Sequence, residues 1–154
     1  MDETLVRAFR SSAVITFKDM FGLDAEAGVP SQLSADEDHG WDITGLVGLA
    51  GQAQGVVAVR LAASLLERLF VVSGVTAAGD KERKELESGL VGELTNIIAG
   101  HAASDLHGID IEIAPPVVVR GPNHHIGWPG IAPVVKMPFS LSDGGFEVDL
   151  CMKL

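Results

Sequence analysis

Cysteine is almost absent from the sequence, since Cys151 is the only one in 154 residues. A framework of disulfide bonds is therefore excluded, and this cysteine usage is typical of a reducing compartment. No apolar run reaches the length of about 18 residues that a membrane-spanning helix needs. Residues 1–10 carry acidic side chains where a signal peptide has a basic region and an apolar core. We therefore expect a cytoplasmic protein without a membrane partner.

Positive charge is also scarce, with 11 Lys and Arg against 21 Asp and Glu and a formal net charge of −10. Nucleic acids attract clusters of Lys and Arg, so no nucleic acid is expected as a partner. The acidic run at 36–38 is interpreted as a solvated loop. With 47% hydrophobic residues the chain is long and apolar enough for one core, and we expect a single domain over residues 1–154.

Three segments have helical spacing of apolar residues. Asp2 and Gly22 are the expected N-cap and stop of the first helix, and Ser64 and Gly74 those of the second. The predicted helices span residues 2–21, 65–74 and about 81–106.

The remaining segments alternate as strands do. A hairpin is expected over 41–60 with its turn near Gly51-Gln52. Further strands are predicted over 109–114, 117–121, 132–141 and 145–154, and loops over 23–40 and 121–130. This mixture lacks a regular βαβ alternation. It predicts an α+β fold in which an antiparallel sheet carries helices on one face.

The long predicted helix has an unusual outer face. Its core-facing arc contains Leu90, Leu94, Ile97 and Ile98, with Val91 and Ala102 at the margin. Another, roughly opposite, arc contains Gly89, Glu93, Asn96 and Gly100, each one turn from the next, with Gly92 close by.

Glycine inside a helix costs ~1 kcal/mol relative to alanine, so glycines beside Glu93 and Asn96 favour close approach by another surface. The carboxylate of Glu93 can pair with a cation, and the carboxamide of Asn96 can hold and orient a water molecule. An ordinary solvated helix face, with glycines needed for packing inside the protein, is the alternative interpretation.

The run ELTNIIAG, which is Glu93-x-x-Asn96 followed by Ile-Ile-Ala-Gly, resembles the CheC/CheX/FliY chemotaxis phosphatase family. The hairpin WDITGLVGLAGQAQGVVAVRL and the strand PPVVVRG also look like segments of that family. The resemblance covers the chain from about Trp41 onward. Because the sequence has one Glu-x-x-Asn motif, it is most similar to the single-site CheX type.

The resemblance implies a phosphorylated CheY-like receiver domain as the partner and hydrolysis of its aspartyl phosphate as the reaction. Glu93 would pair with a lysine of the receiver, and Asn96 would orient the attacking water. Mg²⁺ would belong to the receiver, and this chain would hold no metal. The sequence departs from the family pattern at Gly89, where Asp or Ser is usual, and in a shorter interval from Asn96 to Pro116.

Two other functions stay open at this point. A non-catalytic adaptor could bind a receiver or a flagellar or signalling component without hydrolysis. A small-molecule enzyme is less well supported, because no cluster of titratable residues typical of a pocket is visible. A homodimer through the edges of the antiparallel sheet is also expected.

Several residues with reactive side chains have simpler explanations. His101 and Asp105 are interpreted as an ordinary i,i+4 pair rather than part of a metal site. His124 and His125 are expected in a surface loop, since adjacent residues seldom bind one metal. Cys151 is interpreted as a strand residue rather than a nucleophile, because no activating base is near it in the sequence.

Overall fold

The computed structural model describes residues 2–34 and 40–154, so the acidic run at 36–38 lies outside the described residues. The helices are α1 (Glu3–Phe21), α2 (Ala63–Val72) and α3 (Asp80–Asp105). The strands are β1 (Glu26–Ala27), β2 (Ser31–Gln32), β3 (Ile43–Gly51), β4 (Gln54–Leu61), β5 (Ile111–Ile113), β6 (Val117–Arg120), β7 (Val135–Leu141) and β8 (Gly144–Lys153).

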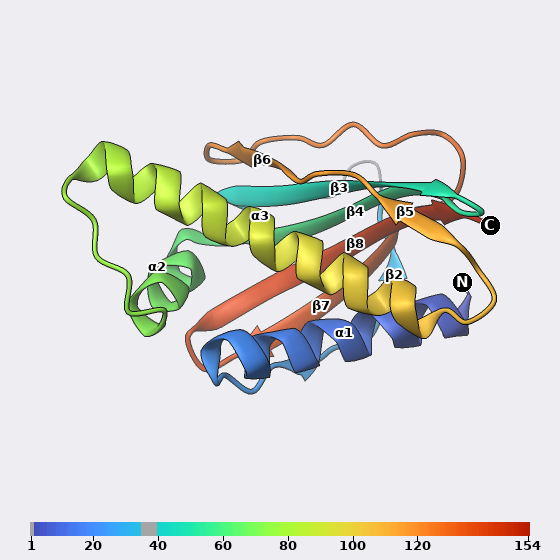
Figure 1. Ribbon diagram of the computed structural model, residues 1–154, viewed down its shortest axis with the longest axis horizontal. Coiled ribbons are helices and arrows are strands. Elements are labelled where there is room, and N and C mark those ends of the chain that lie inside the picture. The colour runs from blue at the N-terminus through green and yellow to red at the C-terminus, as the bar shows by residue number, and fades with distance from the viewer. Residues whose placement is uncertain (1, 35–39) are drawn as a thin grey trace.

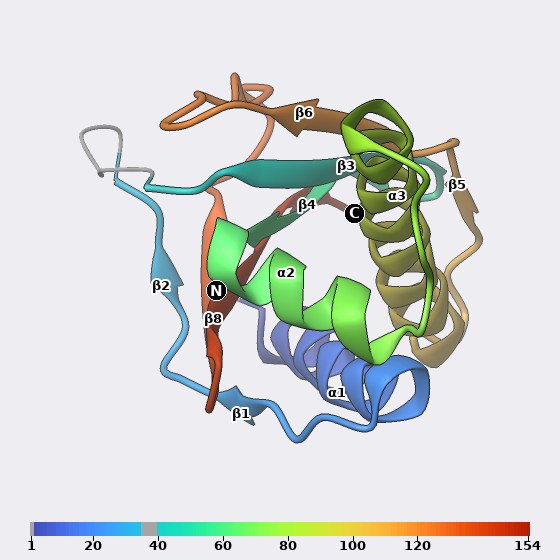
Figure 2. The same ribbon diagram turned by 90° about the vertical axis from the view of Figure 1, so that its left-hand side faces the viewer.

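All eight strands belong to one antiparallel sheet with the order β1-β7-β8-β4-β3-β5, while β2 pairs with β7 and β6 with β3. Helices α1 and α3 lie side by side on one face of this sheet (Figure 1). Helix α2 closes one end of the molecule (Figure 2). The predicted α+β architecture is therefore confirmed.

The ends of α1 follow the predicted capping. The Asp2 carboxylate accepts hydrogen bonds from the backbone N–H groups of Thr4 and Leu5, at 2.8 and 3.3 Å. Gly22 ends the helix in the left-handed region with φ 67°, where glycine carries no steric penalty. The β3–β4 hairpin also turns where expected, directly after Gly51.

The start of α2 differs from the prediction. Ser64 lies inside the helix, and the N-cap residue Ala62 offers no side-chain acceptor. The carboxylate of Asp42 accepts a hydrogen bond from Ala63 N–H at 2.7 Å instead. The sequence could not indicate this cap, because Asp42 is close to the helix only once β3 and β4 have paired.

The segment predicted as a loop over 23–40 contains two short strands. β1 and β2 each pair two residues with β7, at Glu26↔Ser140 and Ser31↔Lys136 among others. Their four residues are exposed, so no alternation of apolar and polar side chains marks them in the sequence.

The core lies between the sheet and the two long helices. Phe146 of β8 stacks on Phe17 of α1 at 4.1 Å between ring centroids and on Phe139 of β7 at 4.6 Å. Buried apolar residues from every layer join these rings in one cluster. Burial of this apolar surface is the main force that fixes the helices on the sheet.

Helix α3 approaches β3 closely at Gly45. A Cβ atom at this position would lie 2.0 Å from the Thr95 hydroxyl oxygen and 3.1 Å from the Val91 carbonyl oxygen. The buried Thr95 hydroxyl donates a hydrogen bond to that carbonyl at 2.7 Å. Only glycine in the strand leaves room for this contact, so Gly45 sets both the height and the rotation of α3.

Two further contacts hold α3 from its sides. The Ser12 hydroxyl of α1 donates a buried hydrogen bond to the Ile98 carbonyl oxygen at 2.7 Å. On the other side, Arg120 at the end of β6 donates to the Lys84 carbonyl at 3.1 Å and pairs with Glu87 at 3.1 Å. Helix α3 is therefore held by β3 on the sheet side, by α1 on one flank and by β6 on the other.

The sheet face away from α1 and α3 carries buried charged groups. Arg60 Nη1 lies 3.7 Å from the Asp149 carboxylate, and its Nε donates to the Thr44 hydroxyl at 3.2 Å. Glu147 is also buried and lies 3.8 Å from Lys136 Nζ. Burial raises the pKa of Asp149 to about 9, Glu147 adds to the rise, and Arg60 and Lys136 oppose it.

We predict that Gly45→Ala destabilises the protein by about 1–3 kcal/mol, because the added methyl group overlaps the Thr95 hydroxyl. Thr95→Ala removes the nearest clashing atom. The double variant should therefore lose less stability than the sum of the two single variants. Denaturant unfolding of all four proteins measures this coupling. Strictly additive losses would contradict the proposed contact.

We also predict that Asp149 lowers the free energy of unfolding as the pH rises from 5 to 8. In the unfolded chain Asp149 ionises near its ordinary pKa of 3.8, whereas the folded protein keeps this proton up to about pH 9. Between these values the folded state binds more protons, so Asp149 contributes a loss of up to about 1.4 kcal/mol per pH unit. The free energy of unfolding of Asp149→Asn should depend less steeply on pH between 5 and 8. Equal slopes for both proteins would exclude this role.

Candidate functional site

The buried face of α3 is turned relative to the expected one. Leu94 and Ile98 are fully buried as predicted, but Leu90 and Ile97 are only half-buried. The buried set is centred instead on the side that faces β3, and it comprises Glu87, Val91, Gly92, Leu94, Thr95, Ile98, Ala99 and Ala102. The space above Gly45 explains the rotation, because the Thr95 hydroxyl fits into it.

Glu93 and Asn96 are both exposed and lie one turn apart on the outer face of α3. Within the part of the chain that the structure describes, neither side chain makes a hydrogen bond or an ion pair. Their helix, in contrast, is anchored at Thr95 and Ile98. A carboxylate and a carboxamide thus project from a rigid support with their polar atoms available to another molecule.

Two of the three predicted glycines border this pair. A Cβ atom at Gly89 would meet no described atom within 4 Å, so the surface beside Glu93 is open. At Gly100 a Cβ atom would meet only Ile113 Cδ1, at 3.9 Å. Both positions are compatible with close approach by another protein.

Gly92 does not belong to the outer surface, which corrects the sequence-based assignment. It is buried, and a Cβ atom there would lie 3.4 Å from Pro116 Cγ and 3.5 Å from Val118 Cγ2. This glycine allows the segment that contains Pro116 and β6 to pack against α3. Its role is internal packing, the alternative that the helical spacing had left open.

An apolar groove adjoins the site. It lies between the outer face of α3 and the end of α2, has a volume of about 330 Å³, and includes Gly89 and Glu93 in its wall. The other lining residues are Phe70, Ser73, Val75, Glu85, Leu86 and Leu90. This groove could not be predicted from the sequence, because its walls come from two helices and the connection between them.

The loop over 121–130 is confirmed and His125 in it is exposed, but His101 and His124 differ from their sequence-based interpretation. Exposed His101 and Asp105 form no ion pair or hydrogen bond within the described ranges, since both extend into solvent at the end of α3. His124 is half-buried, and its ring forms hydrogen bonds with the Thr44 hydroxyl at 2.6 Å and with the Gly121 carbonyl at 2.7 Å. It therefore attaches the loop to the sheet rather than facing solvent.

Cys151 lies in β8 and is buried, as expected of a strand residue. Burial raises the pKa of its thiol, which also lies 3.4 Å from the Ala132 carbonyl oxygen. Among residues 2–34 and 40–154, no three His, Cys, Asp or Glu side chains are grouped as metal ligands. Nor does any helix in these ranges have the length and apolar character to cross a membrane.

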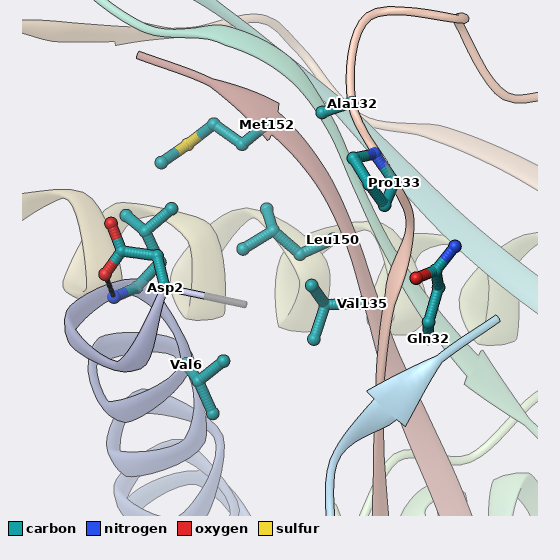
Figure 3. Close-up of a pocket in the computed structure, with 9 residues that line it drawn as sticks. Asp2, Val6, Gln32, Ala132, Pro133, Val135, Leu150 and Met152 are labelled. Atoms are coloured by element: carbon teal, nitrogen blue, oxygen red, sulfur yellow. Dashed lines mark hydrogen bonds between the residues drawn. The ribbon is translucent and has the colours of Figure 1, made fainter.

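A separate pocket of about 220 Å³ lies beside the N-terminus of α1 (Figure 3). Its lining is mostly apolar and consists of Asp2, Leu5, Val6, Gln32, Ala132, Pro133, Val135, Leu150 and Met152. The one carboxylate in it, that of Asp2, already caps α1. No residue of α3 lines this pocket, and it offers none of the paired polar groups found at Glu93 and Asn96.

Comparison with known proteins gives consistent matches. The family model described as Chemotaxis phosphatase CheX matches residues 43–140. A curated relative from Thermotoga maritima, named CheY-P phosphatase CheX, is 30% identical over 157 residues, which cover 99% of this chain and 98% of that protein.

Solved structures agree with these sequence matches. Chemotaxis protein CheX from Vibrio vulnificus is 29% identical with a TM-score of 0.87, over 97% of this chain and 99% of that one. The complex of CheX with CheY, BeF₃ and Mg²⁺ from Borrelia burgdorferi contains a chain that is 27% identical, with a TM-score of 0.82 over 97% of both chains. The similarity extends over nearly the whole of each molecule.

Proposed function

The chain belongs to the CheX family of chemotaxis phosphatases, and we propose that it hydrolyses the aspartyl phosphate of a CheY-like receiver domain. The relative from Thermotoga maritima is named a phosphatase of CheY-P, and the homologue from Borrelia burgdorferi forms a complex with CheY. These similarities favour an enzyme, a protein aspartyl-phosphate hydrolase, that acts in chemotaxis or a related two-component system.

The observation that carries the proposal for this chain is the presentation of Glu93 and Asn96. Both are exposed on the outer face of α3, one turn apart, without intramolecular partners among the described residues. Such a pair can enter the active site of another protein without first breaking contacts of its own. The rigid helix keeps the two groups at a fixed spacing, which lowers the entropic cost of positioning them.

Asn96 is proposed to orient the attacking water. In the reaction, water attacks phosphorus, the bond from phosphorus to the aspartyl oxygen breaks, and the carboxylate leaves. A carboxylate is a good leaving group, so the reaction mainly needs positioning and charge stabilisation. A carboxamide can accept a hydrogen bond from the water and donate one to a phosphoryl oxygen. No general base with a shifted pKa is required of this chain.

Glu93 is proposed to bind a cationic side chain of the receiver, as the resemblance implies for a lysine. That contact would place α3 in a fixed orientation over the acyl phosphate. The Mg²⁺ ion is assigned to the receiver, and no residue of this chain is offered as its ligand. We place the reaction in the cytoplasm, with the chain acting as one domain.

A homodimer through the sheet edges stays a prediction. The strands at the two edges are short, because β1 and β2 pair two residues each with β7, and β5 and β6 pair three and four with β3. Short edge strands limit the backbone available to a second chain.

We predict that Asn96→Ala removes the acceleration of receiver dephosphorylation, because no group remains to orient the water. Effects of positioning of this kind are typically ~100-fold or more in rate. Phosphate release from a phosphorylated receiver, followed at saturating concentrations of each variant, measures the effect. Binding and thermal stability should stay close to wild type.

His101→Ala is the matched control for Asn96→Ala, since His101 is exposed on the same helix and its side chain makes no hydrogen bond or ion pair with a described residue. It should keep the wild-type rate. A wild-type rate in Asn96→Ala would refute the role of this residue. Binding of a BeF₃-loaded receiver by a wild-type chain that never accelerates phosphate release would instead identify an adaptor.

We predict that Glu93→Ala chiefly weakens receiver binding. The loss of one charge-assisted contact is worth ~1.5–3 kcal/mol, which corresponds to an increase in Kd of about ten-fold to 150-fold. Titration of the BeF₃-loaded receiver measures this change. Glu82→Gln, which alters an exposed carboxylate in the first turn of α3, should leave Kd unchanged. An equal Kd for Glu93→Ala and wild type would contradict the pairing.

A further inference from the structure

We propose that the apolar groove between α2 and α3 binds an apolar part of the same receiver domain, beside the acyl phosphate that Asn96 approaches. This inference rests on the proposed function and identifies a second area of the partner surface. Its occupant is the receiver itself, because the groove and the Glu93 site share residues.

Exposed apolar side chains are concentrated at this place. Val71, Val72 and Val75 are 59%, 38% and 44% exposed, and they lie within five consecutive residues at the end of α2. Val75 lines the groove together with Phe70, and both also line an adjoining hollow that contains Val71. Single exposed valines are ordinary on protein surfaces, but a cluster beside a concave wall is typical of an interaction site.

The groove is continuous with the proposed catalytic surface. Gly89 and Glu93 form one wall of it, and Glu93 lies one turn from Asn96. The open space above Gly89 removes the barrier that a side chain would place between the groove and Glu93. A protein that reaches Asn96 from this side must therefore cover the groove as well.

Contacts within the chain hold the groove in shape before any partner binds. Arg83 of α3 pairs with Glu67 of α2 and with Glu87 one turn along its own helix. The Arg83 guanidinium also lies 4.5 Å from the centroid of the Phe70 ring, in cation–π geometry. These contacts connect the two helices that form the walls. Little conformational entropy is therefore lost when a partner binds.

An apolar contact in the groove would also supply binding affinity that the Glu93 contact does not provide on its own. The contact through Glu93 is worth at most ~3 kcal/mol, whereas a Kd of about 1 μM corresponds to about 8 kcal/mol, so further contacts must supply the rest of the affinity. At protein interfaces a few side chains that fill well-packed, desolvated pockets near the centre carry most of the affinity. The groove thus adds to the affinity that Glu93 provides, while Asn96 supplies the rate.

The test uses the full chain and the receiver domain that the wild-type protein dephosphorylates. Val75→Asp places a charge in the groove and should raise KM about ten-fold, equivalent to about 1.4 kcal/mol, with kcat retained within about two-fold. Val75→Thr, which keeps the shape but replaces one methyl group with a hydroxyl, should raise KM by a smaller factor. Because Val75 is 44% exposed, both variants should unfold at the wild-type denaturant midpoint.

Val29→Asp is the matched control, since Val29 is 84% exposed and lies between β1 and β2, away from the groove. It should change neither KM nor kcat. A wild-type KM in folded Val75→Asp, or a loss confined to kcat, would overturn the groove proposal and leave the proposed function intact. Failure of the wild-type chain to accelerate any receiver would overturn both.

Discussion

The close contact between Gly45 and Thr95 is the constraint on which the proposed site depends. Because a strand residue without a side chain faces α3, the helix can settle with the Thr95 hydroxyl against the sheet. Asn96, the next residue, is then turned by about 100° toward solvent. The same rotation exposes Glu93 one turn earlier. The polar pair thus faces outward as a consequence of packing beneath the helix.

The contacts along α3 differ between its two halves. On one side the Ser12–Ile98 hydrogen bond joins α3 to α1, and on the other the segment around Pro116 packs against Gly92. These contacts fix the half of the helix that carries Asn96. The earlier half is joined to α2 through Arg83, which leaves an apolar groove instead of a filled interface. Rigid support and an open partner surface therefore occur on the same helix.

Much of the fold could be predicted from the sequence. The limits of the long helices, the hairpin at Gly51 and the outward direction of Glu93 and Asn96 follow from local periodicity and capping, which act within a few residues. Contacts between distant segments could not be predicted. Asp42 capping α2 and Gly92 packing against β6 depend on pairing across the sheet.

Residue type was also a poor guide where polar groups are buried. Thr95 looks like a surface residue, yet its hydroxyl is satisfied by the Val91 carbonyl inside the core. His124 looks like part of a solvated loop, yet its ring bridges two polar groups. A glycine inside a strand, such as Gly45, was the one available signal of close approach by another element.

The most direct measurement is a structure of this chain bound to a receiver domain loaded with BeF₃ and Mg²⁺. The account predicts that α3 lies across the receiver active site, with the Asn96 carboxamide within hydrogen-bond distance of a water opposite the aspartyl oxygen. A complex in which the receiver contacts another face, and Asn96 stays in bulk solvent, would contradict it.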